Sequence, residues 1–101
     1  MEQLERITYM EQALDISEAG IAAMREALEA YHAAQDKIQE LFMYYSSRQW
    51  MDDYDDGCAG KLPNDLKCGV LSQDAVHSML EENNDLMVEL EKLVQEHSAK
   101  L

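Results

Sequence analysis

The chain has 101 residues, which is enough for one domain with a modest core. Its 21 acidic residues outnumber 8 basic ones, and the formal net charge is −13. This balance disfavours binding to nucleic acids, which depends on Lys and Arg that neutralise phosphates. It disfavours an anionic membrane surface for the same reason. It suits a solvated helical surface, and it permits a basic protein partner.

The N-terminal segment MEQLERITYMEQ is charged from its second residue, so it lacks the basic start and apolar centre of a signal peptide. No stretch approaches the roughly 20 apolar residues that a membrane-spanning helix needs. Two cysteines do not form the dense disulfide framework of a small secreted protein. We therefore expect a cytoplasmic protein.

A heptad repeat runs through the first half of the chain and predicts a helix over about residues 2–45. With Ile7 at position a, positions a and d are Ile7, Met10, Leu14, Ser17, Ile21, Met24, Leu28, Tyr31, Gln35, Ile38, Phe42 and Tyr45. Small residues flank this stripe at position g, namely Ala13, Gly20, Ala27 and Ala34. Ser17 and Gly20 interrupt the stripe, but its phase is the same on both sides. We therefore expect one continuous helix that packs as in coiled coils.

The connector, residues 44–76, holds three of the four glycines, the only Pro, the only Trp and both cysteines. Ser46 and Ser47 can end the first helix and cap a short helix over about 47–55. Trp50 then becomes an anchor with an apolar body and an N–H that needs a partner. A loop follows over 56–71. Its apolar residues predict that the loop is held against the helices: Leu62, Leu66, Val70 and Leu71.

The connector also contains residue types that bind metals or act as nucleophiles. The acidic cluster is Asp52, Asp53, Asp55 and Asp56. It precedes Gly57, but neither register places oxygen ligands and Gly as a calcium-binding EF-hand loop requires. Cys58 and Cys68 are ten residues apart and fit neither a C-x-x-C motif nor zinc-ligand spacing. We therefore predict free thiols, no metal, no cofactor and no catalytic residue.

The last part of the chain predicts a second helix over about residues 72–98. Ser72 opens it, and Leu71 and Val76 are placed for a hydrophobic staple. Its apolar stripe includes one polar seam residue, Asn83. The fold class predicted is all-α: a long N-terminal and a shorter C-terminal helix forming an antiparallel, coiled-coil-like hairpin within one domain.

The two predicted long helices differ in length, at about 65 Å and about 40 Å for a rise of 1.5 Å per residue. The shorter helix cannot cover the whole stripe of the longer one, and Ile7, Met10 and Leu14 stay partly bare. Bare apolar patches of this kind mark association. We therefore expect a homodimer built as a four-helix type of bundle.

The connector resembles a family of short bacterial proteins catalogued only as a domain of unknown function. The resemblance rests on the patterns YYxSxxWxxDY and AGKLPxDLKxGVLSxDAV, which begin at Tyr44 and Ala59. Helical flanks of similar length extend it over nearly the whole chain. The chain departs from the pattern at Ser46, Cys58 and Cys68, which weighs against a family-wide role for the thiols. The resemblance implies no activity.

Three hypotheses for function follow. The first is a non-enzymatic module that binds an unknown protein partner, with a surface drawn from Trp50, Asp53, Tyr54, Lys61, Asp65 and Lys67. The second is an acidic inhibitor or immunity-type protein that covers a basic site of its partner. The third is an enzyme with its site in connector residues 50–67, where Asp53, Lys61, Asp65 or Lys67 transfers protons. No phosphate loop, nucleophile elbow or metal motif supports the third.

Overall fold

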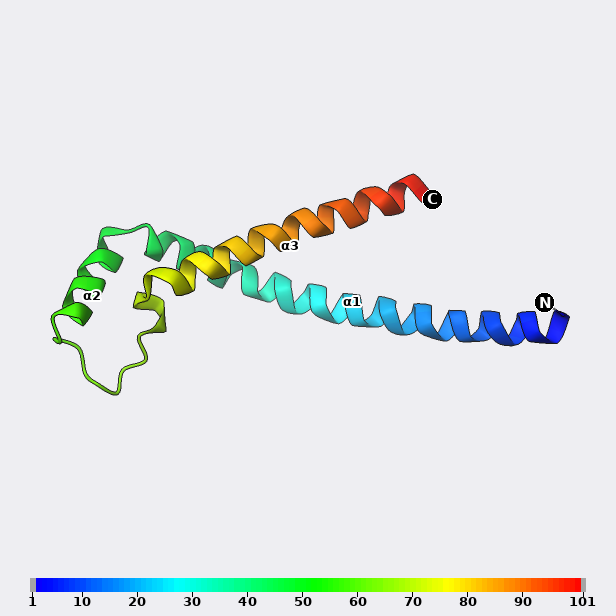
Figure 1. The fold of residues 1–101 in the computed structure, drawn as a ribbon, viewed down its shortest axis with the longest axis horizontal. Coiled ribbons are helices and arrows are strands. Elements are labelled where there is room, and N and C mark those ends of the chain that lie inside the picture. Colours follow the sequence, from blue (N-terminus) through cyan, green and yellow to red (C-terminus); the bar gives the residue numbers. More distant parts are fainter. Residues whose placement is uncertain (1, 101) are drawn as a thin grey trace. The chain divides into compact units, whose positions relative to one another are not determined.

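A computed structural model describes residues 2–100 and is helical throughout its regular parts. Its elements are α1 (Gln3–Tyr45), α2 (Arg48–Cys58), the 3₁₀-helix η1 (Gly69–Leu71) and α3 (Gln73–Lys100) (Figure 1). The described residues contain no strand. The all-α fold class is thus confirmed: a long N-terminal helix, a short helix with an ordered loop, and a shorter C-terminal helix.

The chain divides into two compact units within α1. The N-terminal unit ends at Asp36, and the C-terminal unit begins at Lys37. The N-terminal unit therefore consists of α1 alone, whereas the C-terminal unit holds the end of α1, α2, the loop, η1 and α3. The single-domain organisation stays a prediction.

In the N-terminal unit, α1 continues through Gly20 without interruption. Ser17 fits the helix because its Oγ donates a hydrogen bond to the Ala13 carbonyl oxygen at 2.7 Å. No residue of α1 is buried. Its large apolar a and d residues are between 47% and 65% exposed, and they are Ile7, Met10, Leu14, Ile21, Met24 and Leu28. The bare stripe thus extends further along the helix than Leu14.

The short helix α2 begins as expected and ends later. Ser47 caps it, because its Oγ accepts a hydrogen bond from the Trp50 backbone N at 3.2 Å. The helix continues to Cys58 instead of stopping near Asp55. Two backbone bonds terminate it, from Gly60 N to Gly57 O at 3.2 Å and from Lys61 N to Asp56 O at 3.0 Å. This is a Schellman motif, and Gly60 permits it with a φ of 73°.

The loop after α2 is ordered by its own turns. Leu66 N donates to the Pro63 carbonyl oxygen at 3.2 Å, which closes a turn over Pro63, Asn64 and Asp65, residue types that favour turns. At the start of α3, Ser72 Oγ accepts from Asp74 N at 3.3 Å. The capping role of Ser72 is therefore confirmed.

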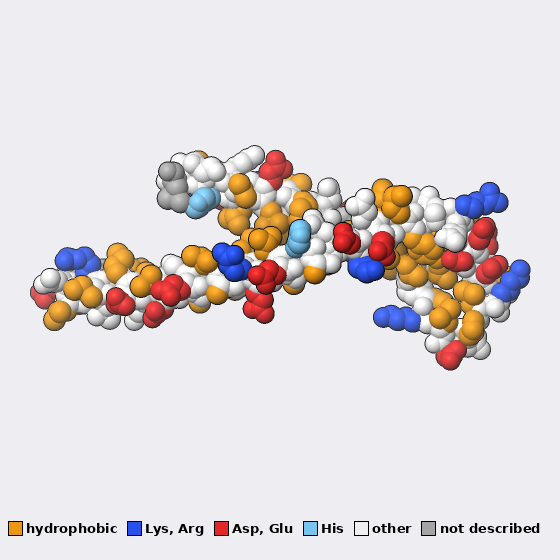
Figure 2. All heavy atoms as spheres, turned by 180° about the vertical axis from the view of Figure 1, so that it is seen from behind, with side chains coloured by type: hydrophobic (Ala, Val, Ile, Leu, Met, Phe, Trp, Pro, Cys, Tyr) orange, Lys and Arg blue, Asp and Glu red, His pale blue; other side chains and the backbone are white. Residues whose placement is uncertain are grey.

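The core of the described chain lies in the C-terminal unit, where hydrophobic side chains gather around the connector (Figure 2). Its two buried residues are Trp50 at 7% exposure and Val76 at 4%. Tyr45 Oη donates to the Gln73 carbonyl oxygen at 3.0 Å, which ties the end of α1 to the start of α3. This bond closes the helical hairpin within the unit. No helix among residues 2–100 has the length and hydrophobicity needed to cross a lipid bilayer.

Candidate functional site

Trp50 is the centre of the connector. Its indole stacks on Tyr54, one turn further along α2, at 5.1 Å between ring centroids and 17° between planes. The Tyr45 and Trp50 rings make a T-shaped contact, with 5.0 Å between ring centroids and 71° between ring planes. Trp50 Nε1 donates a hydrogen bond to the Val70 carbonyl oxygen at 2.9 Å. One side chain therefore joins α1, α2 and η1, and it satisfies its polar group while it is buried.

Tyr44 makes the second link between α1 and α2. Its Oη donates to Asp53 Oδ2 at 2.6 Å. This hydrogen bond to a carboxylate, together with partial burial and the negative charge of Asp53, raises the pKa of Tyr44 from its usual 10.0 to about 12. The phenol therefore keeps its proton at neutral pH and donates it in the hydrogen bond that Asp53 accepts.

A hollow of about 280 Å³ lies beside this pair. Tyr44, Asp53 and Lys67 supply its polar lining. Its other walls are loop and η1 side chains, namely Leu62, Leu66, Cys68, Val70 and Leu71. The hollow thus combines one carboxylate and one ammonium with mostly apolar walls, a lining typical of small-ligand pockets.

A second hollow, of about 480 Å³, adjoins the first and shares Leu62, Leu66, Cys68 and Leu71 with it. Both cysteines and Tyr54 line it, together with Pro63 and Asn64. Interactions with the neighbouring Cys58 side chain, followed by burial and the negative charge of Asp55, raise the pKa of Tyr54. Cys58 and Cys68 are both free thiols, as predicted.

The structure separates the residues predicted for an interaction surface. Asp53 and Lys67 meet at the first hollow, and Tyr54 lines the second. Lys61 lies outside both, with its Nζ 3.8 Å from Asp56 Oδ1. Asp65 is exposed in its turn, and Trp50 is buried, so its ring packs in the core instead of forming a surface.

Tyr44 was missing from the predicted surface, although it shapes the first hollow. Its position was visible in the sequence, because Tyr44 and Asp53 both belong to the YYxSxxWxxDY pattern. The pattern does not indicate in which direction the Tyr44 and Asp53 side chains point. Only the path from α1 through Ser47 into α2 brings the two groups within hydrogen-bonding distance.

The acidic cluster of the connector is largely occupied by internal partners. Arg48 Nε lies 3.8 Å from Asp52 Oδ1, Lys61 lies against Asp56, and Tyr44 bonds to Asp53. Among residues 2–100, no group of three or more His, Cys, Asp or Glu side chains could hold a metal ion.

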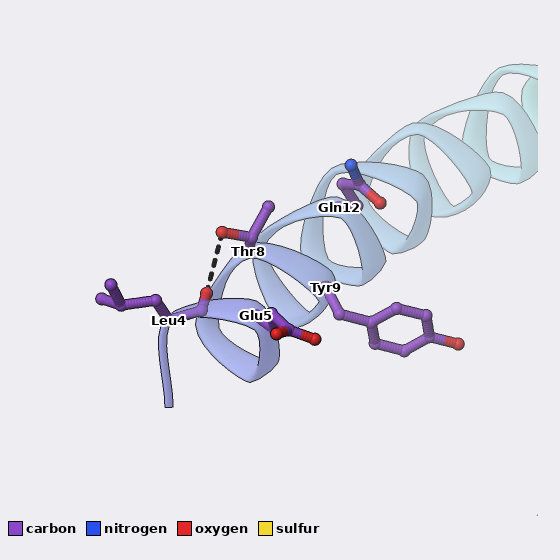
Figure 3. A pocket seen from close by; sticks show the side chains of 5 residues that line it. All are labelled: Leu4, Glu5, Thr8, Tyr9 and Gln12. Carbon is purple, nitrogen blue, oxygen red and sulfur yellow. Dashed lines mark hydrogen bonds between the residues drawn. The ribbon is translucent and has the colours of Figure 1, made fainter. Parts of the chain in front are cut away.

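A further depression, of about 380 Å³, lies near the start of α1. All the residues that line it come from this one helix: Leu4, Glu5, Thr8, Tyr9 and Gln12 (Figure 3). Thr8 Oγ1 donates to the Leu4 carbonyl oxygen at 2.9 Å, so its polar group is turned to its own backbone. Because side chains of a single helix bound it, it is a furrow on a helix surface and not an enclosed ligand site.

Residues 7–93 match a protein family described as a domain of unknown function, DUF4298. The chain belongs to this family. The resemblance carried by the connector patterns is thereby confirmed. No curated protein and no solved structure matches the chain. DUF4298 membership thus extends over both units and assigns no biochemical activity.

Proposed function

We propose that this DUF4298 protein is a non-enzymatic protein–protein interaction module that forms a homodimer through its N-terminal unit. One observation carries the proposal: α1 presents a regular apolar stripe from Ile7 to Leu28 with no buried residue. A contiguous stripe of this kind is unfavourable in water and marks an interaction site. We propose the cytoplasm as its location.

The stripe has the pattern of a helix that pairs with another helix. Its residues recur at heptad positions a and d, and small residues follow one flank. From Ile7 to Leu28 it is about 30 Å long at 1.5 Å per residue. Burying a Leu, Ile or Met side chain contributes about 1.5–3 kcal/mol, so six per copy can offset the entropy cost of association.

The connector supports the enzyme and inhibitor hypotheses less well. An enzyme site needs convergent groups, but of the four candidate residues only Asp53 and Lys67 line the first hollow. An inhibitor that covers a basic site needs a carboxylate surface, and within the acidic cluster Asp53 is engaged by Tyr44 while Asp52 and Asp56 lie beside Arg48 and Lys61. The apolar residues of the exposed stripe, in contrast, are not buried within the described chain.

Sedimentation equilibrium of the full chain tests the proposal. We expect a dimer at micromolar concentration. Leu14→Glu places a carboxylate in the stripe of each copy. Because burying an unpaired charge is unfavourable, the dissociation constant of the dimer should rise about 100-fold. Gln12→Glu is the matched control, since it adds the same charge at position f, away from the stripe, and should dissociate like the unmodified protein. A monomer at all concentrations, or equal effects of both variants, would contradict the proposal.

A further inference from the structure

The residues on either side of the exposed stripe of α1 differ in size and charge. Position e holds Glu11, Glu18, Arg25 and His32. Position g holds Ala13, Gly20, Ala27 and Ala34. In an antiparallel helix pair, e faces e and g faces g of the other copy. In a parallel pair, each g faces an e. The two arrangements therefore bring different pairs of these flanking residues together.

We infer that two copies pair antiparallel through α1, with the two-fold axis passing near Ala19 and Gly20; this inference rests on the proposed homodimer. That register places every large stripe residue except Ile21 opposite an apolar or aromatic residue of the second copy. Leu14 lies opposite Met24, and Met10 opposite Leu28. Ser17 lies opposite Ile21.

Charge supports this register. Glu11 faces Arg25 of the second copy, and the symmetry makes the contact twice. In the isolated chain neither Glu11 nor Arg25 has an ion pair within residues 2–100. A parallel pair keeps an attraction between Arg6 and Glu11 but leaves Arg25 facing Gly20. In the antiparallel pair Glu18 meets its own copy near the axis, on a flank where solvent screens the repulsion.

The glycine at position 20 also supports this register. It lies inside α1 with ordinary helical φ, and a Cβ added there would meet nothing within 4 Å. Nothing in the chain itself therefore requires a glycine, which weakens a helix. Near the two-fold axis, Gly20 of each copy faces the other on the flank of small residues. Close approach of the two backbones there gives the glycine a use.

Ser17 is compatible with the same seam. A hydroxyl placed against Ile21 of the second copy needs a hydrogen-bond partner. The Ser17 Oγ already donates to the Ala13 carbonyl oxygen of its own helix at 2.7 Å. It can therefore enter the seam without leaving an unpaired donor.

Distances between spin labels test the orientation in the full chain. Both cysteines are first changed, Cys58→Ser and Cys68→Ser, and a single cysteine is added as Glu5→Cys or Ala19→Cys for a nitroxide. Both label positions are f positions on the outer face of α1. In the antiparallel dimer the two labels at position 5 are offset by about 42 Å along the axis, whereas those at position 19 have no offset.

We expect pulsed dipolar spectroscopy to give a distance at position 5 that exceeds 40 Å and is clearly longer than the distance at position 19. Equal distances at both positions would mean parallel pairing and would overturn the inference while leaving the homodimer intact. The absence of any intermolecular distance, together with a monomeric mass, would overturn the proposed homodimer itself. Sedimentation of each labelled variant shows whether the label has disturbed association.

Discussion

The two units of the chain differ in whether they bury any apolar side chain. In the C-terminal unit, Trp50 and Val76 are buried, and indole, phenol and backbone groups saturate one another's hydrogen bonds. In the N-terminal unit, residues of similar hydrophobicity such as Leu14 and Leu28 are at least half exposed. The connector therefore folds upon itself, whereas the first helix leaves its apolar stripe exposed, and this is the surface for which we propose a second copy as partner.

Trp50→Ala should have the largest effect, because it destabilises the C-terminal unit alone. It removes two ring contacts, a bond to Val70 and most of a small core. Replacing a buried large aromatic residue with Ala costs about 3–5 kcal/mol. We expect hydrogen exchange, followed by mass spectrometry, to show lost protection in α2 and at the start of α3. Amides before Asp36 should exchange as in the unmodified protein. A uniform loss along the whole chain would mean that the two units unfold together.

Gly20→Leu should act on the other unit. A larger side chain near the proposed axis holds the two backbones apart, so we expect the dimer to dissociate about tenfold more readily, which corresponds to about 1.4 kcal/mol. The helix itself should gain about 0.8 kcal/mol from the better propensity of Leu. Circular dichroism and sedimentation should therefore change in opposite directions. Ala19→Leu, at outer position f, is the control and should leave association unaltered.

Ser47→Ala should weaken the junction of α1 and α2. Its Oγ accepts from Trp50 N and donates to the Tyr44 carbonyl oxygen at 2.6 Å. Loss of a helix cap costs about 1 kcal/mol. Urea denaturation followed by tryptophan fluorescence measures this loss directly. Ser46→Ala removes a hydroxyl from the same turn that does not cap α2, and it should have a smaller effect.

Tyr44→Phe should have the smallest effect at neutral pH and the most informative pH dependence. The bond to Asp53 is partly exposed to solvent, so its removal should cost about 1 kcal/mol. The pKa of Tyr44 is raised in the folded state, so the phenol stabilises the fold fully below its unfolded pKa of 10.0. This stabilisation should fall as the pH rises from 10.0 to about 12.

The measurement is the difference in unfolding free energy between the unmodified protein and Tyr44→Phe at several pH values. That difference should be constant at neutral and mildly alkaline pH and then shrink above pH 10. Using the difference cancels contributions that both proteins share, including that of Tyr54, whose pKa is also raised. A difference that stays constant to pH 12 would show that the Tyr44 phenol does not stabilise the fold through this bond.

Local signals in the sequence predicted most helix boundaries, because caps and turns depend on residues a few positions apart. Ser47 and Ser72 cap the helices as expected. The end of α2 was predicted too early, since the aspartates before Gly57 resembled a loop. The Schellman motif at Gly60 terminates the helix instead, and Gly57 is still part of α2. A Cβ added at Gly57 would lie 3.6 Å from the side chains of Leu62 and Leu71.

The sequence alone determined the all-α class, the heptad stripe of α1 and the character of the connector, because these follow from periodicity and short-range hydrogen bonding. Only the tertiary structure decided which groups meet across the connector: the Trp50 indole with Val70, Tyr44 with Asp53, and Tyr45 with Gln73. The partners in these contacts are up to 28 residues apart. They depend on the path of the whole loop, and that path is set by the joint packing of several segments around Trp50.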